Sequence, residues 1–185
     1  YFQHGLYVRN YGHPNQLFHL AGALLAFAVG TTWACKLVVA AAQIAILVTG
    51  ARLADYLGRS RWSAILLAPL ALGFTYYWGL VANLIGFAAF FSALPVIDRF
   101  ALFPTTRGLA KACGVFLFLF FAHESVFVTA IGFAGLVAVA HPPDRRLTPL
   151  RLLPAVFGVA VLVGHLFYQR QFFPPNKIEV PAVYP

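Results

Sequence analysis

Two neighbouring residues able to do chemistry stand in the middle of a long apolar run. His123 and Glu124 separate the largely apolar residues 108–122 from residues 125–140. Glu124 is the only acidic residue between Asp98 and Asp144. A lone carboxylate between two apolar segments is costly unless it lies at a membrane interface or in a polar cavity. A histidine there is a metal ligand, a base, or simply a hydrogen-bonded residue of the interface, so any functional account has to explain this pair.

A second short turn, at residues 76–79, carries aromatic side chains. The segments 62–78 and 125–140, each next to one of the turns, extend as helices only about 24–26 Å, against a hydrocarbon thickness of about 30 Å. We therefore expect both turns to lie at or just below the outer membrane interface, where polar groups lining a cavity are tolerated. The residues that would share this outward-facing depression are Tyr76, Tyr77, Trp78, His123 and Glu124, with Asn83 one helical turn past Gly79.

Each candidate also has a plainer interpretation. Tyr and Trp at helix ends commonly form the aromatic belt of a membrane protein. Glu124 can cap a helix that begins at Ser125, where the positive end of the helix dipole favours a carboxylate. His13 lies between Gly12 and Pro14, as a turn residue does. Phosphate-binding glycine loops, HExxH and CxxC are all absent from the sequence.

The elements that position these residues are membrane helices. Hydrophobic residues make up 61% of the chain and charged residues 10%, against roughly 25% charged in a soluble domain. The apolar segments are long enough, or nearly so, to span a bilayer. We predict an all-α, polytopic transmembrane helical bundle with about six spans plus one short interfacial or re-entrant helix at 15–29. The predicted spans are 33–53, 62–78, 80–97, 108–122, 125–140 and 150–168.

The basic residues predict the orientation of these spans. Three Lys or Arg residues stand in each of the segments 52–61, 99–111 and 145–151, and none stands at 76–79 or 123–124. Because Lys and Arg mark the cytoplasmic side, we expect 52–61, 99–111 and 141–151 inside a cell inner membrane. The turns and an extended tail at 169–185 would lie outside. Residues 1–14 read as an outer interfacial segment, although a crossing helix at 15–29 would place them inside.

The net charge of +8 would point to nucleic acid in a soluble protein. Here the basic residues fall in alternate loops, where topology requires them, so we expect the lipid bilayer as the partner and no nucleic acid. The chain contains no methionine and opens with Tyr1, which is neither a translation start nor a signal peptide. We therefore expect it to be part of a longer polypeptide.

The order of features along about residues 11–140 forms a recognisable pattern. A proline leads into a short apolar helix, and a longer helix with a basic residue near its start follows and ends in a polar stretch. Next comes an aromatic-glycine turn that is followed by an asparagine. A later helix ends in histidine. The segments are Tyr11-Gly12-His13-Pro14, Ala34-Cys35-Lys36-Leu37, Leu53 to Arg59, Tyr77-Trp78-Gly79 with Asn83, and Ala122-His123. This order resembles the membrane part of the polyprenyl-phosphate-dependent glycosyltransferases of the GT-C superfamily, and related bacterial polytopic membrane proteins.

The resemblance implies transfer of a sugar from a polyprenyl-phosphate carrier to an acceptor at the outer membrane face. In that superfamily the catalytic acidic residue lies in the first outer loop, which would precede Tyr1, so no catalytic residue can be assigned within this chain. The resemblance implies that His13, His123 and Glu124 touch carrier phosphate, acceptor or a divalent cation. Lys36 would attract the phosphate if it faces the cavity. No cofactor is evident from the residues themselves.

Two other functions fit the sequence. The chain could be a non-catalytic subunit of a larger membrane complex, with its helices as packing surface for lipid, pigment or other subunits. Small residues such as Gly132, Ala134 and Gly135 would then mark helix contacts. A transporter or channel fragment is disfavoured, because the spans carry few polar groups at their middle.

Overall fold

The computed structural model describes residues 14–73, 81–140 and 148–172, and in these ranges the regular structure is entirely helical. Seven α-helices and one 3-10 helix are present there, without any strand, so the all-α prediction is confirmed. The elements are α1 (Gln16–Val29), α2 (Thr31–Tyr56), the 3-10 helix η1 (Arg61–Leu67), α3 (Ala68–Leu72), α5 (Val81–Leu102), α6 (Thr106–Ala122), α7 (Glu124–Ala140) and α8 (Thr148–Phe172).

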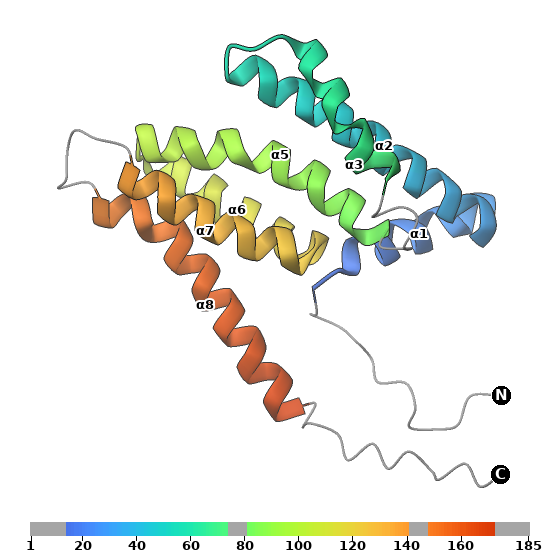
Figure 1. The fold of residues 1–185 in the computed structure, drawn as a ribbon. Coiled ribbons are helices and arrows are strands. Elements are labelled where there is room, and N and C mark those ends of the chain that lie inside the picture. The colour runs from blue at the N-terminus through green and yellow to red at the C-terminus, as the bar shows by residue number, and fades with distance from the viewer. Residues whose placement is uncertain (1–13, 74–80, 141–147, 173–185) are drawn as a thin grey trace, which may run out of the picture.

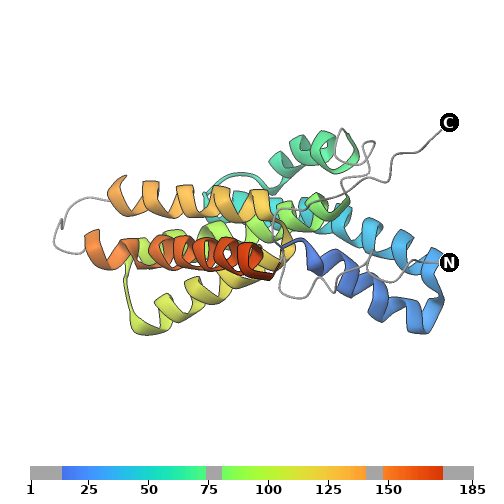
Figure 2. The same cartoon turned by 90° about the horizontal axis from the view of Figure 1, so that it is seen from below.

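Helix α5 is the central element of the bundle. It packs against α2 on one side and against α6 and α7 on the other, as Figure 1 shows. Helix α8 lies along α7 and α6, and the views in Figures 1 and 2 agree on this arrangement. Helices α1, η1 and α3 pack against α2. The molecule therefore consists of two helical groups that share α5.

Both groups have an apolar core, and α5 contributes to each. Phe116 and Phe127 are fully buried in one core and meet edge to face, with their ring centroids 6.1 Å apart. Ile97 of α5 packs into this same core. The other core holds the fully buried Ile46 of α2 and Leu84 of α5. Since lipid tails are as apolar as these side chains, close packing rather than exclusion from water holds such helices together within a bilayer.

Three helices are long and apolar enough to cross a membrane by length and composition: α2, α5 and residues 149–170 of α8. This finding agrees with a membrane protein but does not confirm six spans. Helices α6 and α7 hold 17 residues each, about 26 Å at 1.5 Å per residue. This is a few ångströms short of the usual hydrocarbon thickness of about 30 Å.

The predicted span 62–78 differs in structure from a single helix. Its described part consists of η1 followed by the five-residue α3. Pro69, in the first turn of α3, lacks the N–H that a continuing helix would use, and proline is accommodated best at a helix start. Residues 74–78 lie outside the described residues, as do nearly all of the segments predicted at 1–14 and 169–185.

The long helices extend further than their predicted spans, mainly at the basic end. The span predicted at 33–53 lies within α2, which continues to Tyr56, and residues 81–97 of the span predicted at 80–97 lie within α5, which continues to Leu102. Arg99, in the last turn of α5, suits the negative end of the helix dipole. The Tyr56 hydroxyl donates a hydrogen bond to Asp98, joining α2 to α5. Charged residues in these segments thus mark where the apolar run ends, and the helix continues past them.

Candidate functional site

The two ends of the bundle differ in chemical character. Arg107 and Lys111 lie in the first part of α6, and His123 follows its last residue. The two ends of this helix stand about 20–25 Å apart. Arg99 lines the same hollow as Arg107 and Lys111. We name this side, with Tyr56 and Asp98, the basic end. The opposite side, at the turn between α6 and α7, is named the turn end.

His123 alone forms the turn between α6 and α7. Its backbone is extended, with φ −167° and ψ 132°, and its N–H donates to the carbonyl of Leu119, which closes α6. Its Nδ1 accepts a hydrogen bond of 3.2 Å from the backbone N–H of Ser125, in the first turn of α7. A side chain that accepts from this position satisfies one of the free N–H groups at a helix start. His123 therefore ends one helix and caps the next.

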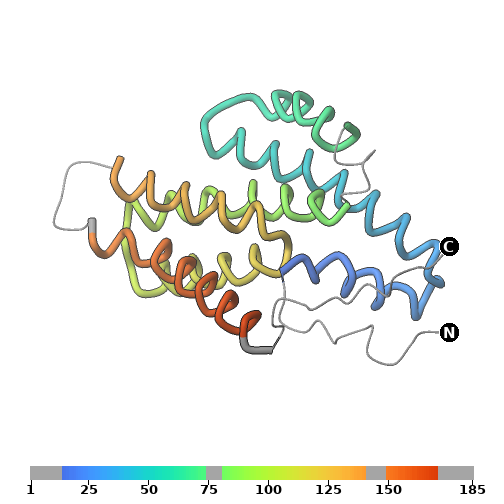
Figure 3. The backbone as a smooth tube through the Cα atoms, turned by 60° about the horizontal axis from the view of Figure 1, so that its bottom comes forward, coloured from blue at the N-terminus to red at the C-terminus, as the bar shows by residue number. Residues whose placement is uncertain are grey.

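Asn15 reaches the same turn from a distant part of the sequence. Its Oδ1 accepts a hydrogen bond of 2.9 Å from the backbone N–H of Glu124, across 109 residues. Asn15 has φ 67°, in the left-handed region that asparagine tolerates better than most residues. Figure 3 shows the start of α1 beside the end of α6. Two free N–H groups at the start of α7 thus receive side-chain acceptors, one from His123 and one from Asn15.

Glu124 is the first residue of α7, and its side chain is exposed. A carboxylate in the first turn interacts favourably with the positive end of the helix dipole. The capping side chains are nevertheless those of His123 and Asn15, which bind backbone N–H groups. Glu124 is therefore the first residue of α7 and not the cap of a helix that begins at Ser125, and its carboxylate is open to solvent or to a ligand.

Gly86 and Asn83 bring α5 to the turn end. A Cβ added at Gly86 would lie 2.7 Å from His123 Cβ and 3.2 Å from Val126 Cγ2, so only glycine allows this approach. Asn83 lies three residues earlier, on the same face of α5. Its side-chain Oδ1 is buried and makes no hydrogen bond. Such an acceptor is costly unless something binds it.

The contacts of His123 define its protonation state. Because Nδ1 accepts from the Ser125 N–H, the neutral ring carries its proton on Nε2. The Ser125 hydroxyl also lies 2.9 Å from Nδ1. Burial lowers the pKa of His123 below its ordinary value of 6.5, while the nearby charge of Glu124 acts in the opposite direction. A neutral His123 can therefore donate from Nε2 at the turn end.

The predicted site residues fall into three groups. The structure brings Asn83, His123 and Glu124 to the turn end. Lys36 stands five residues into α2, exposed, with Nζ 5.1 Å from the ring centroid of Trp33. Its described contact is with Trp33, and none of the hydrogen bonds or ion pairs given for the described residues joins Lys36 to the turn end. The predicted residues His13, Tyr77 and Trp78 lie outside the described residues.

The cluster also contains residues that the sequence did not single out as functional. Asn15 reads as a local helix cap after Pro14, and nothing in the sequence reveals its bond to Glu124. Gly86 is one of 15 glycines, and its role appears only when the turn is placed against it.

A divalent cation, which the resemblance allows, needs several oxygen or nitrogen ligands that converge. In these ranges no group of three or more His, Cys, Asp or Glu side chains converges as metal ligands. Glu124 is the one carboxylate that the described helices place at the turn end.

Comparison with family models, with curated proteins and with solved structures finds no match to this chain. The likeness to the glycosyltransferases therefore stays a prediction from the sequence.

Two substitutions separate the contribution of the Asn15 hydrogen bond to stability from that of the Asn15 backbone conformation. Asn15→Gly keeps the left-handed conformation and removes only the acceptor, so we expect a loss of about 0.5–1 kcal/mol in unfolding free energy. Asn15→Ala should lose roughly 1–2 kcal/mol more, because alanine is strained at positive φ. Unfolding in detergent, followed by circular dichroism, measures both. Wild-type stability in Asn15→Gly would contradict a stabilising role for the bond.

The pKa of His123 predicts a pH dependence of stability. A histidine whose pKa is lowered by folding stabilises the protein above its ordinary pKa of 6.5, and this contribution is lost as pH falls through the folded value. Asn at this position keeps a capping acceptor but does not titrate. We expect the midpoint of thermal unfolding to fall more in the wild type than in His123→Asn between about pH 7 and pH 5. Identical pH profiles for the two proteins would contradict this assignment.

Proposed function

We propose that the chain is a membrane-embedded part of a GT-C-like glycosyltransferase, which moves a sugar from a polyprenyl-phosphate carrier at the outer membrane face. The observation that carries the proposal is that an unsatisfied acceptor, a histidine able to donate an N–H and a carboxylate all lie at one end of a largely apolar bundle. These groups belong to Asn83, His123 and Glu124, which come from two separate helices and the turn between them.

Each of these groups has a use in sugar transfer. The neutral His123 can donate a hydrogen bond from Nε2 to a phosphate oxygen of the carrier. The buried Oδ1 of Asn83 can accept a hydrogen bond from a sugar hydroxyl, which would satisfy it. The Glu124 carboxylate can accept one from the acceptor hydroxyl. The proposal places the principal catalytic acid outside residues 1–185, and it assigns binding and orientation to this chain.

The proposal includes an orientation in a cell inner membrane. The described basic residues Arg99, Arg107 and Lys111 lie at the end away from His123. By the preference of Lys and Arg for the cytoplasmic side, the basic end would face the cytoplasm and the turn end would face outward. A polyprenyl-phosphate sugar on the outer leaflet would then meet the polar cluster.

A second candidate is a non-catalytic subunit of a larger membrane complex. It is favoured by the capping bonds, which give His123 Nδ1 and Asn15 Oδ1 purely structural roles. In that case a neighbouring chain would supply the donor that Asn83 lacks, and Glu124 would serve only the helix dipole.

Transfer activity separates these two candidates. The protein as its gene encodes it is placed in lipid vesicles with a radiolabelled polyprenyl-phosphate sugar, and release of the sugar to acceptor is followed. We expect Asn83→Ala, His123→Gln and Glu124→Gln each to lower the rate by about tenfold or more, the size expected when a positioning hydrogen bond is lost. Arg59→Gln, an exposed change near the basic end, should leave the rate unchanged.

No turnover by the wild type, together with no binding of the polyprenyl phosphate, would overturn the proposal. The subunit function would be supported instead if the three variants also assembled normally with a co-purifying membrane chain. Circular dichroism on the same preparations separates loss of fold in a variant from loss of its polar group.

A further inference from the structure

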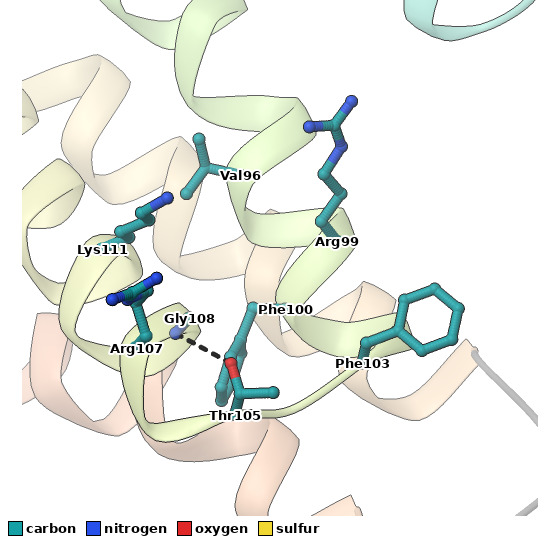
Figure 4. A pocket seen from close by; sticks show the side chains of 8 residues that line it. All are labelled: Val96, Arg99, Phe100, Phe103, Thr105, Arg107, Gly108 and Lys111. Atoms are coloured by element: carbon teal, nitrogen blue, oxygen red, sulfur yellow. Dashed lines mark hydrogen bonds between the residues drawn. The ribbon is translucent and has the colours of Figure 1, made fainter.

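The basic end contains a hollow that the proposed sugar-transfer site does not use. It is a cavity of about 540 Å³ between the end of α5 and the start of α6, a volume within the range of ordinary ligand pockets. Its cationic lining residues are Arg99 from α5 and Arg107 and Lys111 from α6. Figure 4 shows Arg107 and Lys111 together on α6, with Arg99 across from them on α5.

The positive charge of this cavity is not compensated by its own lining. None of the residues that line it is acidic. Asp98, next to Arg99 in sequence, accepts a hydrogen bond from the Tyr56 hydroxyl of α2. The ion pair between Arg61 and Asp55 lies on other elements.

The placement of these cations is unfavourable for α6 alone. Arg107 and Lys111 are four residues apart, so their like charges face each other on one side of the helix. Arg107 is also the second residue of α6, whose first turn has no acidic residue. Cations there oppose the positive end of the helix dipole. A bound anion would reverse both effects, because it would sit among three cations and beside a helix start.

The rest of the cavity lining identifies the kind of anion. Two phenylalanines line the cavity wall. Phe100 is buried, whereas Phe103 is 74% exposed. An exposed aromatic ring beside a cluster of cations suits a molecule with a charged head and an apolar body. Within the proposed orientation the basic end is also at the level where lipid headgroups lie, and basic pockets between membrane helices bind anionic headgroups.

We propose that this cavity binds the phosphate of an anionic phospholipid, with Arg107 and Lys111 as the principal phosphate contacts and Phe103 against the start of an acyl chain. Arg99 adds charge from α5 while its guanidinium stays over the Tyr56 ring, 5.1 Å from the centroid. The site is independent of sugar transfer, and it would fix the basic end of the bundle to the lipid headgroup layer.

The test is lipid binding by the purified protein in detergent, with native mass spectrometry to count bound lipids. Phosphatidylglycerol and phosphatidylcholine are added separately, and inorganic phosphate is used as a competitor. We expect the wild type to retain phosphatidylglycerol in preference to phosphatidylcholine. Arg107→Gln/Lys111→Gln should weaken phosphatidylglycerol binding by at least about tenfold, because two charge-assisted hydrogen bonds are lost.

The matched control is Arg52→Gln/Arg59→Gln, which also removes two positive charges from exposed residues towards the same end. It should leave binding within about twofold of the wild type, since rim charges outside a site contribute little. Equal loss in both double variants would overturn the proposal in favour of unspecific attraction. Full displacement of the lipid by millimolar inorganic phosphate would also overturn it, and would identify a site for free phosphate.

Folding of the variants does not decide the outcome. If Arg107→Gln/Lys111→Gln fails to fold, the wild type alone still tests the proposal, through its preference between the two lipids and the loss of that preference at high salt. Equal binding of phosphatidylglycerol and phosphatidylcholine by the wild type would then overturn it.

Discussion

The turn end depends on the capping of α7 by two side chains. Helices α6 and α7 are separated by His123 alone, so the first N–H groups of α7 point into a junction with no loop to satisfy them. In a bilayer or a dry interface an unsatisfied N–H costs several kcal/mol. His123 Nδ1 and Asn15 Oδ1 supply the acceptors. The same bonds bring α1 to the turn and hold the histidine ring in one tautomer.

Helix α5 transmits this local arrangement to the rest of the bundle. Gly86 lets the His123 turn approach α5 closely, and Asn83 lies on the same face one turn earlier. At its other end, α5 is joined to α2 through Asp98 and Tyr56. A rigid helix in contact with both groups keeps the turn end and the basic end apart. The polar groups of the turn end are thereby kept apart from the cations of the basic end.

Much of this arrangement could be predicted from the sequence, because apolar runs and charge clusters are local signals. The helix that ends before His123 and the helix that follows were expected at 108–122 and 125–140, close to the observed α6 and α7. The break in 62–78 was missed, since Pro69 in an apolar run is compatible with a kinked helix as well as with a new start. The bond between Asn15 and Glu124 could not be foreseen, because it joins residues 109 positions apart. Lys36 was grouped with the site through the resemblance and its charge, and its described contact is with Trp33 of its own helix.

The central claim is that the turn end and the basic end face opposite sides of a membrane. Single cysteines at Glu124 and Arg59, both exposed, can test it after Cys35 and Cys113, which are free, are replaced by alanine. A membrane-impermeant maleimide is applied to intact cells and then to permeabilised cells. Glu124→Cys should be labelled in intact cells, and Arg59→Cys only after permeabilisation. Labelling of both from the same side, or the reverse order, would contradict the proposed orientation and the outer sugar-transfer site with it.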